Sequence, residues 1–77
     1  MRVRRELYDI NEFGEKEREP KRIVIETVDL NGYSELFRFE KMCLGIGKSI
    51  AYQYENGEIS CIRIQGSHER EYIRIIG

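Results

Sequence analysis

The stretch Tyr52-Gln53-Tyr54-Glu55-Asn56-Gly57-Glu58-Ile59-Ser60-Cys61 decides the expected fold. An Asn-Gly pair between two alternating segments predicts a β-hairpin. A type I′ turn needs a positive φ angle at both central residues, and Asn and Gly tolerate it best. A second pair, Asn31-Gly32, follows the largely β-branched run of residues 23–28. The two pairs together indicate an all-β protein built from hairpins.

The length of the chain limits the number of domains. A chain of 77 residues has room for one hydrophobic core, so residues 1–77 are expected to form a single small β domain. We predict an antiparallel meander of five to six strands that forms a small barrel or roll. The glycines of Gly45-Ile46-Gly47 suit a sharp change of direction between the two hairpins.

The N-terminal segment has a less regular pattern. Val3, Leu7 and Ile10 have the spacing of one helical face, so a short N-terminal helix within residues 2–13 remains open beside a short strand. Residues 15–22 carry a charge at every position but one and contain no apolar side chain to bury. They therefore predict a solvated loop.

Charge and cysteine content constrain the partners and the compartment. The 13 Lys and Arg residues nearly balance the 14 Asp and Glu residues, so composition alone gives no support for nucleic-acid binding. Cys43 and Cys61 both lie in apolar runs, which predicts buried thiols and a cytoplasmic location. The N-terminus lacks the apolar segment of a signal peptide, and no apolar run approaches the roughly 18 residues of a membrane span. We expect no membrane partner.

Counting outward from each Asn-Gly pair predicts a register. The first pair places Val24 opposite Phe39, so residues 33–40 are expected to form a strand beside residues 23–30. The second pair places Tyr52 opposite Cys61 and Ala51 opposite Ile62.

The last two strands are joined at Gly66-Ser67-His68-Glu69. A four-residue loop pairs Ile62 with Ile73 and Arg63 with Tyr72, and it avoids an Arg–Arg pair that a tighter turn would create. One predicted face is a core face: its apolar residues are Ala51, Ile62, Ile64, Ile73 and Ile75, and its polar residues are Ser49, Gln53, Ser60 and Glu71. The other predicted face combines tyrosines with arginines: Tyr52, Tyr54, Arg63, Tyr72 and Arg74.

Motifs for catalysis, metals and cofactors are weak. Gly45-Ile46-Gly47-Lys48-Ser49 ends like a Walker A phosphate loop, but Met42 stands where the first glycine is required, and a strand is expected to follow it. His68 is the only histidine, and the predicted register keeps it away from Cys61. We therefore expect no enzyme activity, no catalytic residue, no metal site and no cofactor.

The candidate binding residues are those of the mixed face: Tyr52, Tyr54, Arg63, Tyr72 and Arg74. Such a face suits the inner wall of a barrel, a protein interface anchored by Tyr and Arg, or a platform on which unpaired bases stack. We predict a non-enzymatic binding or regulatory module that acts through protein–protein contacts, as a homo-oligomer. The alternative is a small β-barrel that binds single-stranded nucleic acid.

Overall fold

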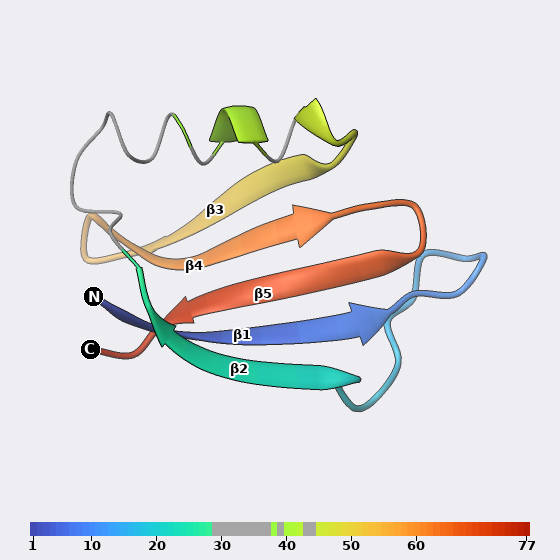
Figure 1. Ribbon diagram of the computed structural model, residues 1–77, viewed down its shortest axis with the longest axis horizontal. Coiled ribbons are helices and arrows are strands. Elements are labelled where there is room, and N and C mark those ends of the chain that lie inside the picture. The colour runs from blue at the N-terminus through green and yellow to red at the C-terminus, as the bar shows by residue number, and fades with distance from the viewer. Residues whose placement is uncertain (29–37, 39, 43–44) are drawn as a thin grey trace.

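A computed structural model describes residues 1–28, 38, 40–42 and 45–77. Its strands form one antiparallel sheet with the order β2-β1-β5-β4-β3 (Figure 1). The five strands are β1 (Arg2–Asp9), β2 (Arg22–Thr27), β3 (Ser49–Glu55), β4 (Glu58–Gln65) and β5 (Glu69–Ile75). The expected all-β antiparallel architecture is confirmed, with β3, β4 and β5 forming a meander.

The predicted closure into a barrel is wrong. The edge strands β2 and β3 do not pair with each other in the described part of the chain, so the sheet is open and twisted (Figure 1). Barrel closure requires every strand to have two neighbours. Between the edge strands the chain instead contains helical backbone at Arg38 and at residues 40–42, in a segment drawn beside β3.

The predicted partner of β2 is also wrong. Arg38 and Glu40 are helical, so they do not continue the strand expected over residues 33–40, and the Asn31-Gly32 turn lies outside the described residues. Strand β2 pairs with β1, for example through Val24 and Arg5. Local β propensity predicts a strand but does not identify its partner.

The N-terminal segment is a strand and not a helix. In β1 the side chains of Val3, Arg5 and Leu7 alternate with those of Arg4 and Glu6, and the strand lies between β2 and β5. The neighbouring strands β2 and β5 supply hydrogen bonds along both edges of β1. Pairing within the sheet therefore selects the strand, whereas the spacing of the apolar residues left both helix and strand open.

The central hairpin forms as predicted at its turn and differs beyond it. Asn56 and Gly57 have φ angles of 53° and 79°, as a type I′ turn requires. A β-bulge between Gln53 and Tyr54 then shifts the register, so Tyr52 pairs with Ile62 rather than with Cys61. One extra residue on one strand reverses which face each later side chain occupies.

The register of the last two strands is confirmed. Ile62 pairs with Ile73 and Arg63 with Tyr72, and the loop closes with a hydrogen bond of 2.9 Å from the Gly66 amide to a carbonyl oxygen of β5. This register avoids the Arg–Arg pair that a tighter turn would create, as expected.

The core lies on one side of the sheet, here called the core face and defined by its buried residues Val3, Ile62, Ile64 and Ile73. Ile75 packs against this cluster, as predicted. The bulge brings Ile50 and Tyr52 to the cluster, whereas Ala51 pairs with Arg63 on the opposite side and is not a core residue. The remaining partly buried neighbours are Met1, Val28 and Ile59.

Two polar contacts border the core face. The Tyr52 hydroxyl donates a hydrogen bond to Glu40, which ties the helical segment to β3. Toward β2, the Arg5 guanidinium binds Glu71 and Glu26, each at 2.8 Å. These hydrogen bonds raise the pKa of Arg5 and satisfy Glu26, an acidic residue beside the core that an edge strand can accommodate.

The charged loop before β2 is held at several points. Ile10 and Lys16 form an isolated bridge, and the Lys21 ammonium pairs with Asp9 at 3.0 Å and with Glu69. The hydrogen bond from Lys21 lowers the pKa of Glu69. The helical residues that the structure describes are too few and too polar to cross a membrane.

Candidate functional site: the arginine face

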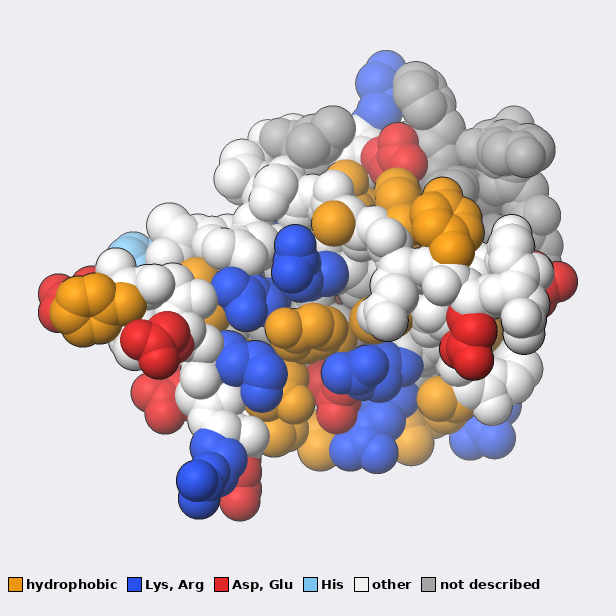
Figure 2. All heavy atoms as spheres, turned by 180° about the vertical axis from the view of Figure 1, so that it is seen from behind, with side chains coloured by type: hydrophobic (Ala, Val, Ile, Leu, Met, Phe, Trp, Pro, Cys, Tyr) orange, Lys and Arg blue, Asp and Glu red, His pale blue; other side chains and the backbone are white. Residues whose placement is uncertain are grey.

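The side of the sheet opposite the core face is rich in arginine. We call it the arginine face and define it by Arg2 and Arg4 on β1, Arg63 on β4, and Arg70 and Arg74 on β5. These five residues share a side because β-strand side chains alternate and the register aligns them, with Arg4 opposite Arg74 and Arg63 opposite Tyr72. Figure 2 shows Lys and Arg side chains gathered over the middle of the sheet.

Three strand carboxylates lie on the arginine face: Glu6 among the arginines, and Glu55 and Glu58 at the tip of the β3–β4 hairpin. Glu6 accepts a hydrogen bond of 2.6 Å from Arg74 Nε and lies 3.5 Å from Arg4 Nε. The hydrogen bond to Glu6 raises the pKa of Arg74. Glu6 is buried, which costs little here because its charge is paired twice. Five guanidinium groups against three carboxylates, two of which lie at the hairpin tip, leave the centre of the arginine face positive.

The arginines differ in how they are held. Arg70 donates to the Gln65 side-chain oxygen at 3.1 Å and to the Gly14 carbonyl at 3.0 Å. Arg63 is exposed and makes no side-chain hydrogen bond or ion pair with any residue that the structure describes. Its donors are therefore directed to solvent and are available to a ligand.

Aromatic rings lie between the cations. Tyr72 packs edge-on against Tyr8, with ring centroids 5.7 Å apart and an interplanar angle of 89°. The Arg74 guanidinium lies 5.2 Å from the Tyr72 ring centroid, and Lys16 Nζ lies 4.4 Å from that of Tyr8. These distances allow cation–π attraction, which holds the charged groups beside the rings.

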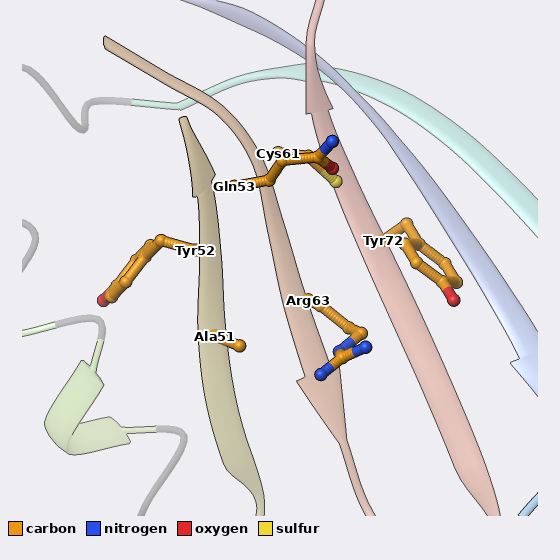
Figure 3. Close-up of a pocket in the computed structure, with 6 residues that line it drawn as sticks. All are labelled: Ala51, Tyr52, Gln53, Cys61, Arg63 and Tyr72. Carbon is orange, nitrogen blue, oxygen red and sulfur yellow. The ribbon is translucent and has the colours of Figure 1, made fainter. Parts of the chain in front are cut away.

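A shallow hollow of about 210 Å³ lies on β3, β4 and β5 beside Arg63. Figure 3 shows the side chains of Ala51, Cys61, Arg63 and Tyr72 on one side of the strands, whereas the Tyr52 ring points to the other. Cys61 is buried, and burial raises the pKa of its thiol. The small Ala51 and Cys61 side chains leave space, and Arg63 and Tyr72 supply charge and a ring.

The structure brings together three of the five predicted binding residues. Arg63, Tyr72 and Arg74 share the arginine face. Tyr52 and Tyr54 lie on the core face, where their ring centroids are 6.5 Å apart and Tyr54 remains 62% exposed. The β-bulge separates the two groups, and a bulge has no reliable signal in the sequence.

Arg2, Arg4 and Arg70 were not predicted as site residues. The sequence contained a pattern that indicates them. Arg2 and Arg4 are two residues apart, as are Arg70 and Tyr72, and residues two apart on a β-strand lie on the same face. The pattern in β1 could be used only after residues 2–9 were known to form a strand.

Metal ligands do not gather in the part of the chain that the structure describes: it contains no cluster of three or more His, Cys, Asp or Glu side chains. Comparisons with protein-family models, with curated proteins and with solved structures found no match for this chain. The proposal below therefore depends on the geometry and charge of the arginine face.

Proposed function

We propose that the protein binds single-stranded nucleic acid across the arginine face. The observation that carries the proposal is charge segregation. The whole chain has a formal net charge of −1, yet on one side of the sheet five arginines of β1, β4 and β5 surround Glu6, and the other two strand carboxylates of that side, Glu55 and Glu58, lie apart at the tip of the β3–β4 hairpin. The protein therefore offers a positive platform for a polyanion without being a basic protein overall.

The chemistry of the cations favours phosphate. All five strand cations of the arginine face are arginines, whose planar guanidinium donates paired hydrogen bonds to phosphate oxygens and stacks on flat rings. Same-face neighbours lie about 7 Å apart along a strand, and adjacent strands are about 4.8 Å apart. Three neighbouring strands therefore present guanidinium groups to a run of several consecutive phosphates.

The hollow favours a strand with unpaired bases. A base placed over Ala51 and Cys61 would contact Arg63 and Tyr72, both of which offer flat surfaces for stacking. A duplex keeps its bases stacked inside and offers this site only phosphates. An acidic peptide has carboxylates for the arginines but supplies no base for the hollow.

Fluorescence anisotropy with labelled oligothymidylate and oligouridylate of about 15 nucleotides tests the proposal. We expect binding that weakens steeply between about 50 and 200 mM salt, since phosphate contacts release counterions. Arg63→Ala should lower the affinity roughly fivefold at 0.1 M salt, because one phosphate contact on a single strand contributes a salt slope of about 0.7.

Two variants serve as matched controls. Arg38→Ala removes the same charge from the helical segment beside β3, and Tyr54→Ala removes an exposed ring from the core face. Both should leave the affinity unchanged. The proposal is wrong if the wild-type protein does not bind at 50 mM salt, if Arg38→Ala and Arg63→Ala reduce binding equally, or if polyglutamate competes as well as the oligonucleotides do.

The expected protein interface built from all five predicted binding residues stays a prediction. Its residues are divided between two sides of the sheet, so a single flat partner does not contact Tyr54 and Arg63 together.

A further inference from the structure

Strand β2 has an exposed edge that is unusually apolar. Ile23, Val24 and Ile25 are 48%, 37% and 55% exposed, and they alternate between the two sides of the sheet. Natural edge strands usually carry charges, prolines or bulges that prevent pairing with another chain. The centre of β2 consists of three consecutive exposed β-branched residues, so it has none of these protective features.

The hydrogen-bond pattern shows which backbone groups of β2 are available. Met1 and Val28 exchange two hydrogen bonds of 3.0 Å, so they form a hydrogen-bonded pair of the β1–β2 ladder. Such pairs alternate along an antiparallel ladder, so Glu26 and Val24 also point their backbone groups toward β1. The amides and carbonyls of Ile23 and Ile25 therefore point away from the sheet.

We propose that two copies of the chain pair through β2, antiparallel and about a two-fold axis at Val24. In this register Ile23 exchanges hydrogen bonds with Ile25 of the partner subunit, and Val24 faces Val24 of the partner subunit. Arg22 faces Glu26 of the partner subunit, so the two residues that face each other at each end of the paired strands carry opposite charges. Every pair from Arg22 to Glu26 is apolar or charge-complementary.

Side-chain pairing favours this register over the two neighbouring registers, with the axis at Ile23 or at Ile25, that also bring outward backbone groups together. An axis at Ile25 would place Val24 opposite Glu26 of the partner subunit, and an axis at Ile23 would place it opposite Arg22 of the partner subunit, so either leaves a single apolar pair across the interface. Arg22 has no side-chain hydrogen bond or ion pair with the described residues. Glu26 accepts from Arg5 Nη1 on one oxygen and is still 37% exposed, so it can accept from a second guanidinium.

The pairing has a consequence for the arginine face. A two-fold axis perpendicular to the sheet keeps the same side of both copies in view, so the two arginine faces lie on one side of a continuous double sheet. A single-stranded nucleic acid that extends beyond the arginine face of one copy would then reach the arginine face of the second. This consequence rests on the proposed function, whereas the pairing itself does not.

Sedimentation velocity from about 1 µM to about 1 mM tests the pairing, because edge-to-edge interfaces of this size are weak. We expect a monomer–dimer equilibrium in the wild-type protein. Val24→Lys should abolish the dimer by placing two ammonium groups at the axis, whereas Val24→Thr keeps the β-branched shape and should retain it. Circular dichroism should show both variants folded.

If Val24→Lys does not fold, Ile25→Pro provides a second variant that should weaken the dimer. The Ile25 amide does not bond to β1, so proline is tolerated there as in other edge strands, and it removes an outward donor. In the wild-type protein the Ile23 and Ile25 amides should exchange with solvent more slowly as concentration rises. The Val24 and Glu26 amides should be protected throughout.

Disulfide cross-linking tests the register. In a Cys43→Ser, Cys61→Ala background, Val24→Cys should cross-link rapidly on mild oxidation, since a non-hydrogen-bonded pair has a Cα separation of about 4.5 Å, which a disulfide can span. Ile25→Cys should cross-link much less. The proposal is overturned by a monomer at every concentration or by preferential cross-linking at Ile25. A wild-type protein that stays monomeric but binds oligonucleotides would overturn the pairing and leave the proposed function standing.

Discussion

The core face and the arginine face are made by the same strands, yet their side chains have opposite surroundings. On β5, Ile73 is 2% exposed in the core cluster, while its neighbour Arg74 lies in an open row with Glu6 and Tyr72. On β4 the same contrast separates buried Ile62 from exposed Arg63. One side of the sheet therefore supplies stability, and the other has side chains whose removal should change binding more than folding.

The largest expected effect compares two adjacent residues of β4. Ile62→Ala should lower the free energy of unfolding by about 2–5 kcal/mol, because it leaves a cavity at a fully buried position. Arg63→Ala should change it by less than about 0.5 kcal/mol. Urea unfolding followed by circular dichroism measures both values. If the alanine variant at Ile62 does not fold, Ile62→Val should cost about 1 kcal/mol.

A similar loss of stability in both variants would contradict the comparison. It would mean that Arg63 contributes to the folded core and that the arginine face is covered by part of the chain.

The second-largest effect concerns the Asn56-Gly57 turn, from which the register of β3 and β4 is counted. Gly57 has a φ angle of 79°, which a β-branched residue adopts only with strain, so Gly57→Val should cost about 1–3 kcal/mol. Thermal unfolding gives the measurement, with about 4–8 °C expected per kcal/mol in a domain of this size. Gly66→Ala in the neighbouring hairpin is the control, since an added Cβ would meet Lys48 at an ordinary 3.6 Å.

An unchanged melting temperature for Gly57→Val, or an equal loss for Gly66→Ala, would argue against the type I′ turn as the element that determines the register.

The third effect separates folding from binding at one residue. Glu6→Gln removes a charged acceptor from Arg74 and Arg4, so the free energy of unfolding should fall by about 1–2 kcal/mol. The arginine face becomes more positive, so oligonucleotide affinity at low salt should rise. Glu71→Gln is the control on the core face, because it removes a similar bond to Arg5.

Glu71→Gln should reduce stability without raising affinity. Parallel losses of stability and affinity in Glu6→Gln would show that the charge of the arginine face does not control binding.

The smallest effect is the pH dependence of an exposed pair at the end of the core face. Lys21 lowers the pKa of Glu69 through a hydrogen bond, so the pair contributes stability above the ordinary carboxyl pKa of 4.5. That contribution is lost as the pH falls through the lower pKa of the folded state. The difference in stability between wild type and Glu69→Gln should therefore shrink in acid. A difference that stays constant from neutral to acidic pH would exclude this pair as its source.

Much of the fold was predictable because it depends on neighbouring residues. Asn56-Gly57 specifies its turn through two backbone angles, and the loop after β4 sets the Ile62–Ile73 register through charge compatibility. The partner of β2 was not predictable in this way. A strand of β-branched residues pairs equally well with several others, and the chain places it against β1.

Part of the candidate site was also predictable, because it too depends on residues that are neighbours in the chain. Arg63, Tyr72 and Arg74 follow from strand alternation and one correct register. Tyr52 and Tyr54 were assigned to the wrong side because Ser60 is left without a partner at the bulge. A single unpaired residue has little effect on local propensity, but it reverses the side of every residue beyond it.

The sequence by itself determined the local conformations: an all-β chain, a type I′ turn at Asn56-Gly57, and strands whose residues alternate in polarity. These properties depend on the φ and ψ preferences and side-chain spacing of residues close together in the chain. Only the tertiary structure decided that β1 lies between β2 and β5 and that the sheet stays open. The arginine face exists because β1, from the start of the chain, pairs with β5 of the C-terminal hairpin, and which strands meet is decided by the packing of the whole core.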